Sequence, residues 1–217
     1  EVTLPQFLFD LERGGLKPLY QSSEWADITS SPVPRWDLIN QKNYASLSVQ
    51  YSRGCPYNCD FCDITVLYGN HPRIKTVEAV LNELEMIYQQ GWRGNVFFVD
   101  DNFIGNKKQL KEKLLPAVIV WMKKKKYPFR FQTQASIDIA SDDLLIDLMI
   151  KAGFGAVFVG IETPDEECLA ECGKYQNTKV DLLKSVKKLQ SAGMDVQAGF
   201  IVGFDSDLVK TSTEHKY

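Results

Sequence analysis

The chain has 217 residues, of which 44% are hydrophobic and 24% are charged, and its formal net charge at pH 7 is −3. These values are ordinary for a globular domain and exclude disorder, collagen and coiled coil as descriptions of the whole chain. The small negative charge favours no nucleic-acid partner, and no apolar run is long enough to predict a transmembrane segment. The first residues, EVTLPQFLFDLERGG, lack the basic start and apolar middle of a signal peptide. We therefore expect a cytoplasmic protein, in a reducing compartment where clustered cysteines are more often metal ligands than disulfides.

Three segments of different character follow one another along the chain. Residues 1–43 contain four prolines between short apolar pieces, so an irregular lead-in or the remnant of a linker is expected. Residues 44–207 read as one core domain. Residues 208–217 form a polar tail with no further apolar strand, and we expect the chain to be a fragment of a longer protein that is truncated after the fifth strand.

Strands and helices alternate after Asn43. The expected strands are 46–52, 95–100, 129–136, 156–162 and 195–203. The expected helices are 76–91, with Thr76 as N-cap and Gly91 as the stop, 107–126, with a kink near Pro116, 141–153, 165–172 and 178–191. This order predicts βαβ units, and hence an α/β fold with a parallel sheet.

Three of the five expected strands, the first, third and fifth, carry polar side chains on one face and apolar ones on the other. In the third expected strand, Arg130, Gln132 and Gln134 share a face, and Phe129 and Phe131 share the opposite one. A flat sheet with helices on both sides would need apolar residues on both faces. The pattern therefore predicts a curved sheet with helices on one side and a polar interior on the other, which is a partial, TIM-like (βα) barrel.

Three of the five cysteines lie within eight residues, in SRGCPYNCDFCDI, directly after the first strand. Gly54, Pro56 and Asn58 favour a loop around a compact object over a helix. A structural zinc site takes four ligands, and the next ligand-type residue is only His71. A cubane iron–sulfur cluster also takes four thiolates as a rule, so three would leave one iron free to bind a substrate.

The spacing Cys-x3-Cys-x2-Cys after the first strand of a (βα) barrel resembles the signature of the radical S-adenosylmethionine superfamily. The resemblance implies that Cys55, Cys59 and Cys62 hold a 4Fe–4S cluster and that S-adenosylmethionine chelates the open iron. It further implies that the reduced cluster cleaves S-adenosylmethionine to methionine and a 5′-deoxyadenosyl radical, with an electron donor such as flavodoxin or ferredoxin as partner. The protein then mainly orients the cofactor and excludes water.

The same resemblance implies contacts to S-adenosylmethionine at the carboxyl ends of the strands, where such barrels gather their reacting groups. Asp100 and Asp101 match the motif that receives the methionine amino group, and Glu162 matches the residue that contacts the ribose hydroxyls. Further candidates near the cofactor are Phe61, Gln134, Ser136, Gly199, Ile201 and Gly203. Read singly, Asp, Asn and Ser after a strand are ordinary turn and capping residues.

Longer stretches, among them SVQYSRGCP, GIETPDEE and QAGFIVGFD, are similar to the cobalamin-dependent subgroup, which includes the enzymes that methylate hopanoid lipids. This implies methyl transfer to a small or lipid-like substrate, with cobalamin in the full-length protein. Gln134 departs from that pattern, because a charged residue is expected there. The fifth-strand motif also lacks the expected Glu and runs into FDSD.

Two other interpretations of the triad stay open. A non-catalytic iron–sulfur electron carrier would need a fourth cysteine and a shielded cluster, and a zinc-stabilised binding module would need a distant fourth ligand. Cys168 and Cys172 lie four residues apart on an expected helix, where paired thiols are usually packing residues.

Overall fold

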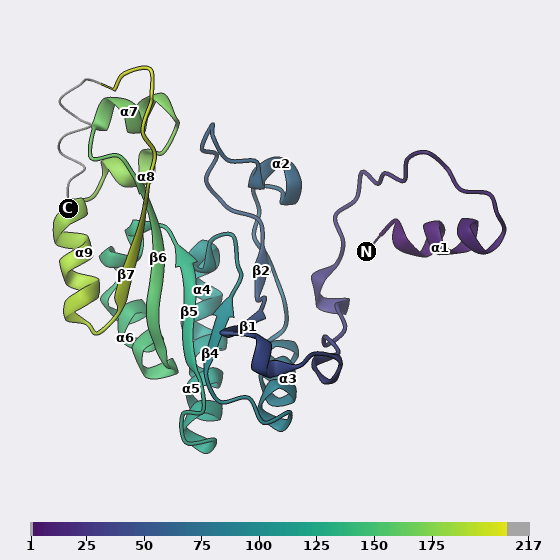
Figure 1. Ribbon diagram of the computed structural model, residues 1–217. Coiled ribbons are helices and arrows are strands. Elements are labelled where there is room, and N and C mark those ends of the chain that lie inside the picture. The colour runs from purple at the N-terminus through teal and green to yellow at the C-terminus, as the bar shows by residue number, and fades with distance from the viewer. Residues whose placement is uncertain (1, 208–217) are drawn as a thin grey trace.

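The computed structural model describes residues 2–207, which build around one parallel sheet (Figure 1). Its strand order is β1-β4-β5-β6-β7, and every neighbouring pair is parallel. The strands are β1 (Ser46–Val49), β4 (Asn95–Phe98), β5 (Arg130–Ala135), β6 (Phe154–Glu162) and β7 (Asp195–Phe200). A separate antiparallel pair, β2 (Ser52–Arg53) and β3 (Arg73–Ile74), follows β1. The expected α/β fold is confirmed.

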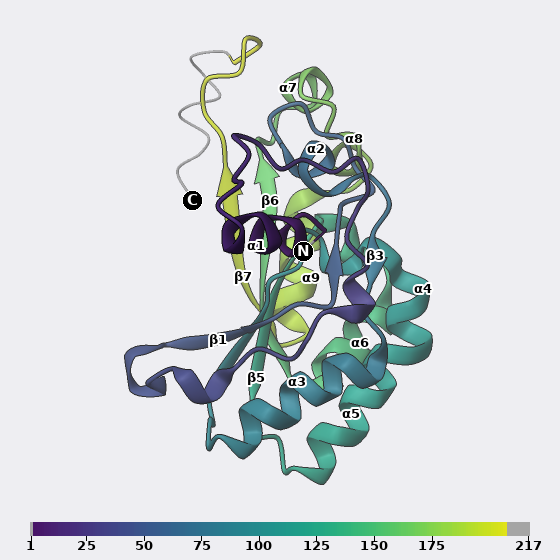
Figure 2. The ribbon, with the colours of Figure 1, turned by 90° about the vertical axis from the view of Figure 1, so that its right-hand side faces the viewer.

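Helices cover one face of the sheet (Figure 2). The larger ones are α3 (Val77–Gln89), α5 (Leu115–Lys124), α6 (Asp143–Ala152) and α9 (Leu182–Ser191). Alternate strand residues point toward them, so Leu47, Val96 and Phe131 are fully buried, and the rings of Phe98, Phe103, Phe131 and Phe154 pack edge-on or tilted against one another. Burial of this apolar layer stabilises the domain by roughly 25 cal/mol for each Å² removed from water.

The opposite face of the sheet carries the polar side chains, as the alternation predicts. A cavity of about 300 Å³ lies on this face, lined by Phe97, Gln132, Thr133, Gln134, Ala156, Val157, Phe158 and Gln197. Within residues 2–207 the sheet is open, with β1 and β7 at its edges. The expected partial barrel is therefore confirmed, with a hydrophilic concave side.

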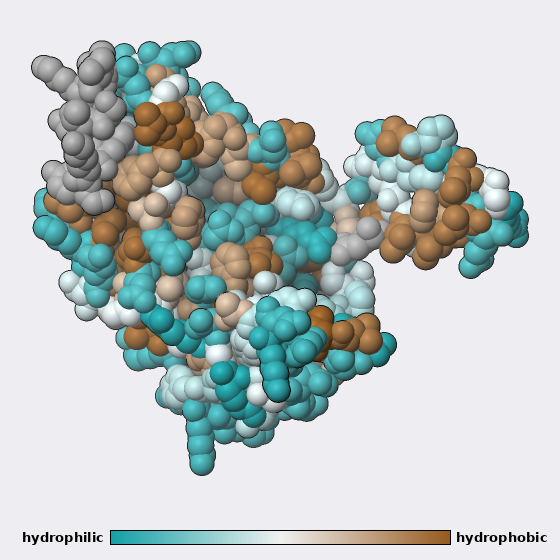
Figure 3. Space-filling model, viewed as in Figure 1, coloured by the Kyte–Doolittle hydropathy of each residue, from teal (hydrophilic) through white to brown (hydrophobic). Residues whose placement is uncertain are grey.

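The first strand is shorter than expected, and the lead-in before it contains short helices. The strand expected to reach residue 52 ends at Val49, because Ser52 turns inward to pair with β3 and is buried. The lead-in contains helix α1 (Leu4–Glu12) and 3₁₀ turns at Ile28–Ser30, Trp36–Leu38 and Gln41–Asn43. Several apolar side chains of α1 are exposed, and Figure 3 shows them as hydrophobic surface on a part that stands off from the sheet.

Two helical regions are more broken than their apolar periodicity suggests. The region expected as one helix, 107–126, consists of α4 (Lys107–Gln109), a π-helical turn (Leu110–Leu114) and α5, after a 3₁₀ turn at Phe103–Asn106. Pro116 explains the wide turn, because it has no N–H to donate and its ring crowds the preceding turn. The helix expected from residue 178 is instead α8 (Tyr175–Thr178) followed by α9. Outside these regions lie α2 (Ile64–Tyr68), a 3₁₀ turn at Ile137–Ser141 and α7 (Glu166–Glu171).

Glu1 and the polar tail, 208–217, lie outside the described residues. Among residues 2–207, no helix combines the length and the apolar character that crossing a membrane requires.

Candidate functional site

The three clustered cysteines lie on a loop between β2 and α2, as the Gly, Pro and Asn residues around them predict. Gly54 opens the loop with a φ of +99°, and its N–H donates to Asp101 Oδ2 at 2.8 Å. The N–H of Cys55 donates to the Gly69 carbonyl at 3.4 Å, and that of Asp60 to the Cys172 carbonyl at 3.0 Å. The loop is therefore fastened at both ends by backbone hydrogen bonds.

Glycine is required at position 54 by both conformation and space. A Cβ added there would lie 2.9 Å from the carbonyl oxygen of Gly69 and 3.2 Å from that of His71, in a backbone region that L-residues rarely adopt. Gly91 has a similar φ of +88° but nothing within 4 Å of an added Cβ. An alanine at position 91 therefore meets the backbone strain of a positive φ without a steric clash.

We predict that Gly54→Ala lowers the free energy of unfolding by about 1–3 kcal/mol more than Gly91→Ala does, because a close backbone contact adds to the shared backbone strain. Urea unfolding of the two variants measures the difference. Equal losses in the two would show that the loop relaxes freely around residue 54.

A cavity of about 250 Å³ lies between this loop and the carboxyl ends of the strands. The sulfur-bearing residues Cys55, Cys59 and Cys62 are half-buried in its wall. The other lining residues are Tyr57, Phe61, Ile64, Asp101, Asn102, Gln134, Ala135, Ser136, Phe158, Gly160, Glu162, Lys174 and Gln176. Gln134 and Phe158 also line the cavity on the sheet's open face, so the two cavities adjoin.

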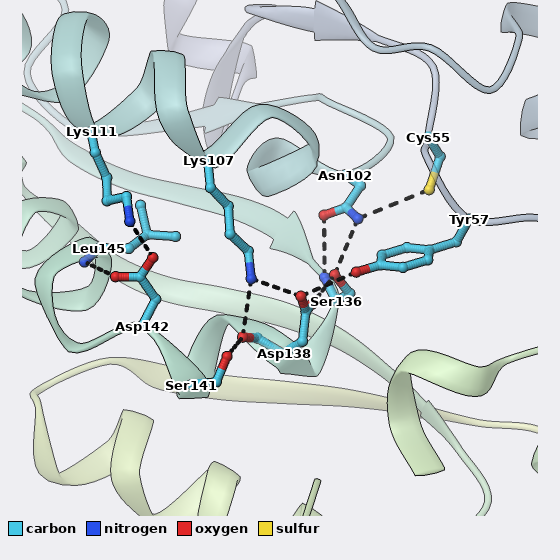
Figure 4. Close-up of polar contacts among 10 residues, drawn as sticks. All are labelled: Cys55, Tyr57, Asn102, Lys107, Lys111, Ser136, Asp138, Ser141, Asp142 and Leu145. Carbon is cyan, nitrogen blue, oxygen red and sulfur yellow. Dashed lines mark hydrogen bonds and ion pairs between the residues drawn. The ribbon is translucent and has the colours of Figure 1, made fainter. Parts of the chain in front are cut away.

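Asp138 fixes one side of the loop, and Figure 4 shows the contacts that converge on it. Its Oδ2 accepts from the hydroxyl of Tyr57 at 3.1 Å and from Lys107 Nζ at 2.7 Å. Its Oδ1 accepts from the hydroxyl of Ser136, whose oxygen in turn accepts from Asn102 Nδ2 at 3.1 Å. Tyr57 lies between the first two cysteines, so this network holds the loop against the end of β5.

Amide groups face two of the three sulfurs. Asn102 Nδ2 lies 3.9 Å from Cys55 Sγ, and Gln176 Nε2 lies 3.6 Å from Cys59 Sγ. Burial raises the pKa of both thiols above the ordinary value, while these donors and, for Cys55, the N–H of Tyr57 lower it. Donors of this kind favour the thiolate, which is the form that binds metal.

A buried ion pair closes the far wall of the cavity. Lys174 Nζ lies 2.5 Å from Glu162 Oε1, with both side chains 10% exposed. Lys174 Nζ also lies 5.6 Å from the centre of the Phe61 ring. Glu162 has a φ of +65°, which is uncommon for a residue with a side chain and marks a position that its surroundings hold under strain.

The structure brings some of the predicted site residues to the cavity and leaves others away from it. Those at the cavity are the three cysteines, Phe61, Asp101, Gln134, Ser136 and Glu162. Gly199, Ile201 and Gly203 are not in its wall. Gly199 packs on the Phe158 ring, and the N–H of Ile201 donates to the Glu162 carbonyl at 2.8 Å.

Asp100 is not among the residues that line the cavity, and its contact with S-adenosylmethionine stays a prediction. It is 0% exposed and accepts from the N–H of Tyr51 and from the N–H and hydroxyl of Ser52. It therefore ties β4 to the start of the loop, and of the two neighbouring aspartates only Asp101 reaches the cavity.

We predict that Asp100 makes stability depend on pH. Burial raises the pKa of Asp100 from 3.8 to about 7, although hydrogen bonds from Ser52 and Tyr51 oppose the shift. Because the folded chain holds this proton more tightly than the unfolded chain does, the free energy of unfolding should fall as the pH rises from 3.8 to about 7. Urea unfolding across this window should show a flatter profile for Asp100→Asn. An equally steep profile in that variant would contradict the assignment.

Several residues of the site could not be identified from the sequence patterns. Tyr57, Asn102, Asp138, Lys174 and Gln176 come from four different segments and meet only in the folded chain. Asn102 is the exception in principle, because it directly follows the aspartate pair after a strand.

The remaining candidate ligands lie outside the site. Cys168 and Cys172 are buried, with their sulfurs near Asp207 Oδ1 and the Leu169 carbonyl respectively. His71 is exposed and contacts Asn70.

Within residues 2–207, no three His, Cys, Asp or Glu side chains converge on a point that could hold a single ion. A multi-iron cluster differs in this respect, because each thiolate binds a different iron. Half-buried thiols on a cavity wall, with amide donors behind them, fit such a cluster.

Residues 49–209 match the model of the radical SAM superfamily. Among curated proteins, an uncharacterized methyltransferase of Synechocystis is 52% identical over 207 residues, covering 95% of this chain and 38% of that protein. The hopanoid C-2 methylase of Rhodopseudomonas palustris is 40% identical over 202 residues, covering 93% of this chain and 38% of that protein. The chain thus spans well under half the length of these relatives.

Two solved structures of one methyltransferase have a fold similar to that of this chain. The radical S-adenosylmethionine methyltransferase TsrM of Kitasatospora setae, with tryptophan substrate and the analogue aza-SAM bound, superposes with a TM-score of 0.67. The match has 19% identity and covers 79% of this chain and 33% of that one. TsrM with cobalamin and a 4Fe–4S cluster bound gives a TM-score of 0.64 at 19% identity, covering 76% of this chain and 32% of that one. Together with the family match over most of its length, these likenesses show that the chain belongs to the radical SAM superfamily.

Proposed function

We propose that this chain is the core of a radical S-adenosylmethionine enzyme in which Cys55, Cys59 and Cys62 bind a 4Fe–4S cluster. The observation that carries the proposal is the set of three half-buried thiols on one wall of a cavity whose other walls are strand ends. Three thiolates leave one iron open to a second ligand. When bound, the reduced cluster supplies the electron that cleaves S-adenosylmethionine to methionine and a 5′-deoxyadenosyl radical.

The chain's own residues bind and orient S-adenosylmethionine in this proposal. Asp101 accepts a hydrogen bond from the loop through Oδ2 and lines the cavity, where a carboxylate attracts the ammonium group of methionine. Glu162, oriented by Lys174, accepts from the ribose hydroxyls. Phe61 lies beside the last cysteine and places an aromatic ring at the same wall, which suits the adenine.

The polar cavity on the sheet's open face supports a place for the second reactant. It adjoins the thiol cavity at Gln134 and Phe158, so a molecule bound there would lie next to bound S-adenosylmethionine. The likeness to hopanoid methylase leads us to propose methyl transfer to a lipid-like substrate by the full-length protein. Cobalamin as methyl carrier, and a flavodoxin or ferredoxin as electron donor, belong to the same proposal.

Anaerobic reconstitution with iron and sulfide tests the proposal. The expected result is about four irons and four sulfides per chain, an absorption band from sulfur-to-iron charge transfer, and 5′-deoxyadenosine after addition of dithionite and S-adenosylmethionine. Full cluster loading without 5′-deoxyadenosine would favour an electron carrier or a truncated, inactive barrel, and would overturn the proposal that this chain cleaves S-adenosylmethionine. Binding of zinc in place of iron would favour a binding module and would overturn the proposed cluster.

A further inference from the structure

Two buried amide side chains approach the cysteine sulfurs from different walls of the cavity. Asn102 follows β4 and is 3% exposed, and Gln176 lies on α8 and is 9% exposed. Their amide nitrogens lie 3.9 Å from Cys55 Sγ and 3.6 Å from Cys59 Sγ respectively. Each amide nitrogen thus lies near a different cysteine sulfur.

The orientation of the Asn102 amide is fixed by its neighbours. Its Oδ1 accepts from the N–H of Ser136 at 3.3 Å, and its Nδ2 donates to the Ser136 hydroxyl oxygen at 3.1 Å (Figure 4). A flipped amide would set its NH₂ against the Ser136 N–H, so the network determines which atom faces the sulfur. The Ser136 hydroxyl is itself held by Asp138, whose charge Lys107 balances. The donor is therefore preorganised toward Cys55.

We propose that Asn102 and Gln176 donate N–H···S hydrogen bonds to the cluster ligands and raise the reduction potential of the cluster. This rests on the proposed function. Reduction adds one negative charge, which spreads over the irons and the sulfurs. A hydrogen bond to a ligating sulfur stabilises that charge, so it favours the reduced state. Both residues act through the cysteines as positioning residues and need not touch S-adenosylmethionine.

A packing role alone would not have this effect on the potential. Leucine has nearly the shape of asparagine and fills the same space without a donor, so Asn102→Leu keeps volume and loses the hydrogen bond. Gln176→Leu likewise removes the donor to Cys59, with a side chain one non-hydrogen atom smaller than glutamine. Asn58 supplies the matched control, because its amide lies on the cysteine loop but is exposed, and its Oδ1 accepts from the Thr65 hydroxyl.

The test is a redox titration of the reconstituted chain, followed by the electron paramagnetic resonance signal of the reduced cluster. For Asn102→Leu and Gln176→Leu we expect the equilibrium constant for one-electron reduction to fall about tenfold, which is a shift of about 59 mV to more negative potential. The double variant should show about the sum, because the amides contact different sulfurs. Asn58→Leu should titrate like the unsubstituted chain.

The outcomes separate the two proposals. An unchanged potential in a fully loaded Asn102→Leu or Gln176→Leu chain overturns the inference for that residue. A shift as large in Asn58→Leu overturns it for both. If Asn102→Leu does not fold, Asn102→Asp replaces it, because it keeps the acceptor for Ser136 and should lower the potential further by adding charge. Failure of the unsubstituted chain to bind any cluster would instead overturn the proposed function.

Discussion

Replacing any one of Cys55, Cys59 and Cys62 by serine is expected to reduce the iron content of the reconstituted chain from about four atoms to nearly none. A serine hydroxyl is a much weaker ligand for iron than a thiolate, and the two remaining thiolates would leave two irons without a protein ligand. All three side chains lie on the wall of one cavity, so each substitution should have the same effect. Iron and acid-labile sulfide analysis after anaerobic gel filtration measures it.

Cys168→Ser is the matched control for these variants. Cys168 is fully buried on α7, outside the cavity, and its sulfur donates weakly to Asp207 Oδ1 at 3.5 Å, a contact that a hydroxyl can also make. This variant should bind as much iron as the unsubstituted chain. Loss of iron in Cys168→Ser, or its retention in a triad variant, would show that the ligand set has been assigned wrongly.

Lys174→Met is expected to lower the free energy of unfolding by about 3–5 kcal/mol, since it leaves the Glu162 carboxylate buried with no counter-charge. The ion pair is 2.5 Å long with both side chains 10% exposed, so only the small part of the Glu162 carboxylate that faces the cavity can gain water in place of the lost partner. Urea unfolding of the chain without cluster gives the value directly, because the change concerns the protein alone.

Two further variants tell this effect apart from a simple loss of a lysine. Lys184→Met removes a lysine that is 85% exposed and paired with Asp181, and it should cost no more than about 1 kcal/mol. The double variant Glu162→Gln/Lys174→Met should recover most of the lost stability, because no charge is left buried. Equal losses for Lys174→Met and Lys184→Met would mean that the Glu162 carboxylate finds another partner.

Much of the fold followed from local patterns in the sequence. Alternation of Gln132 and Gln134 with Phe129 and Phe131 predicted which side of β5 the helices cover. The cysteine loop followed from its own Gly, Pro and Asn residues. These signals succeed because they report properties of neighbouring residues, namely side-chain periodicity and backbone freedom.

The parts that could not be predicted depend on contacts between distant segments. Asp100 and Asp101 are adjacent and chemically alike, and only the turn after β4 decides that one binds Ser52 while the other reaches the cavity. Lys174 pairs with Glu162, twelve positions earlier in the chain, and α7 lies between the two. Ser52 continued the polar alternation of β1, yet its pairing with β3 buried it.

The cysteines are far in sequence from the residues that enclose them, and this affects when the proposed cluster can be assembled. The thiols are neighbours even in an unfolded chain, but the groups that enclose their loop lie far along the chain. Asp101 is 47 residues after its partner Gly54, Asp138 is 81 after Tyr57, and Gln176 is 117 after Cys59. Iron offered during synthesis would therefore meet thiols that are exposed to oxygen and to competing metals. Insertion after the chain has folded avoids this hazard, so the yield of intact centre should depend on when iron is supplied.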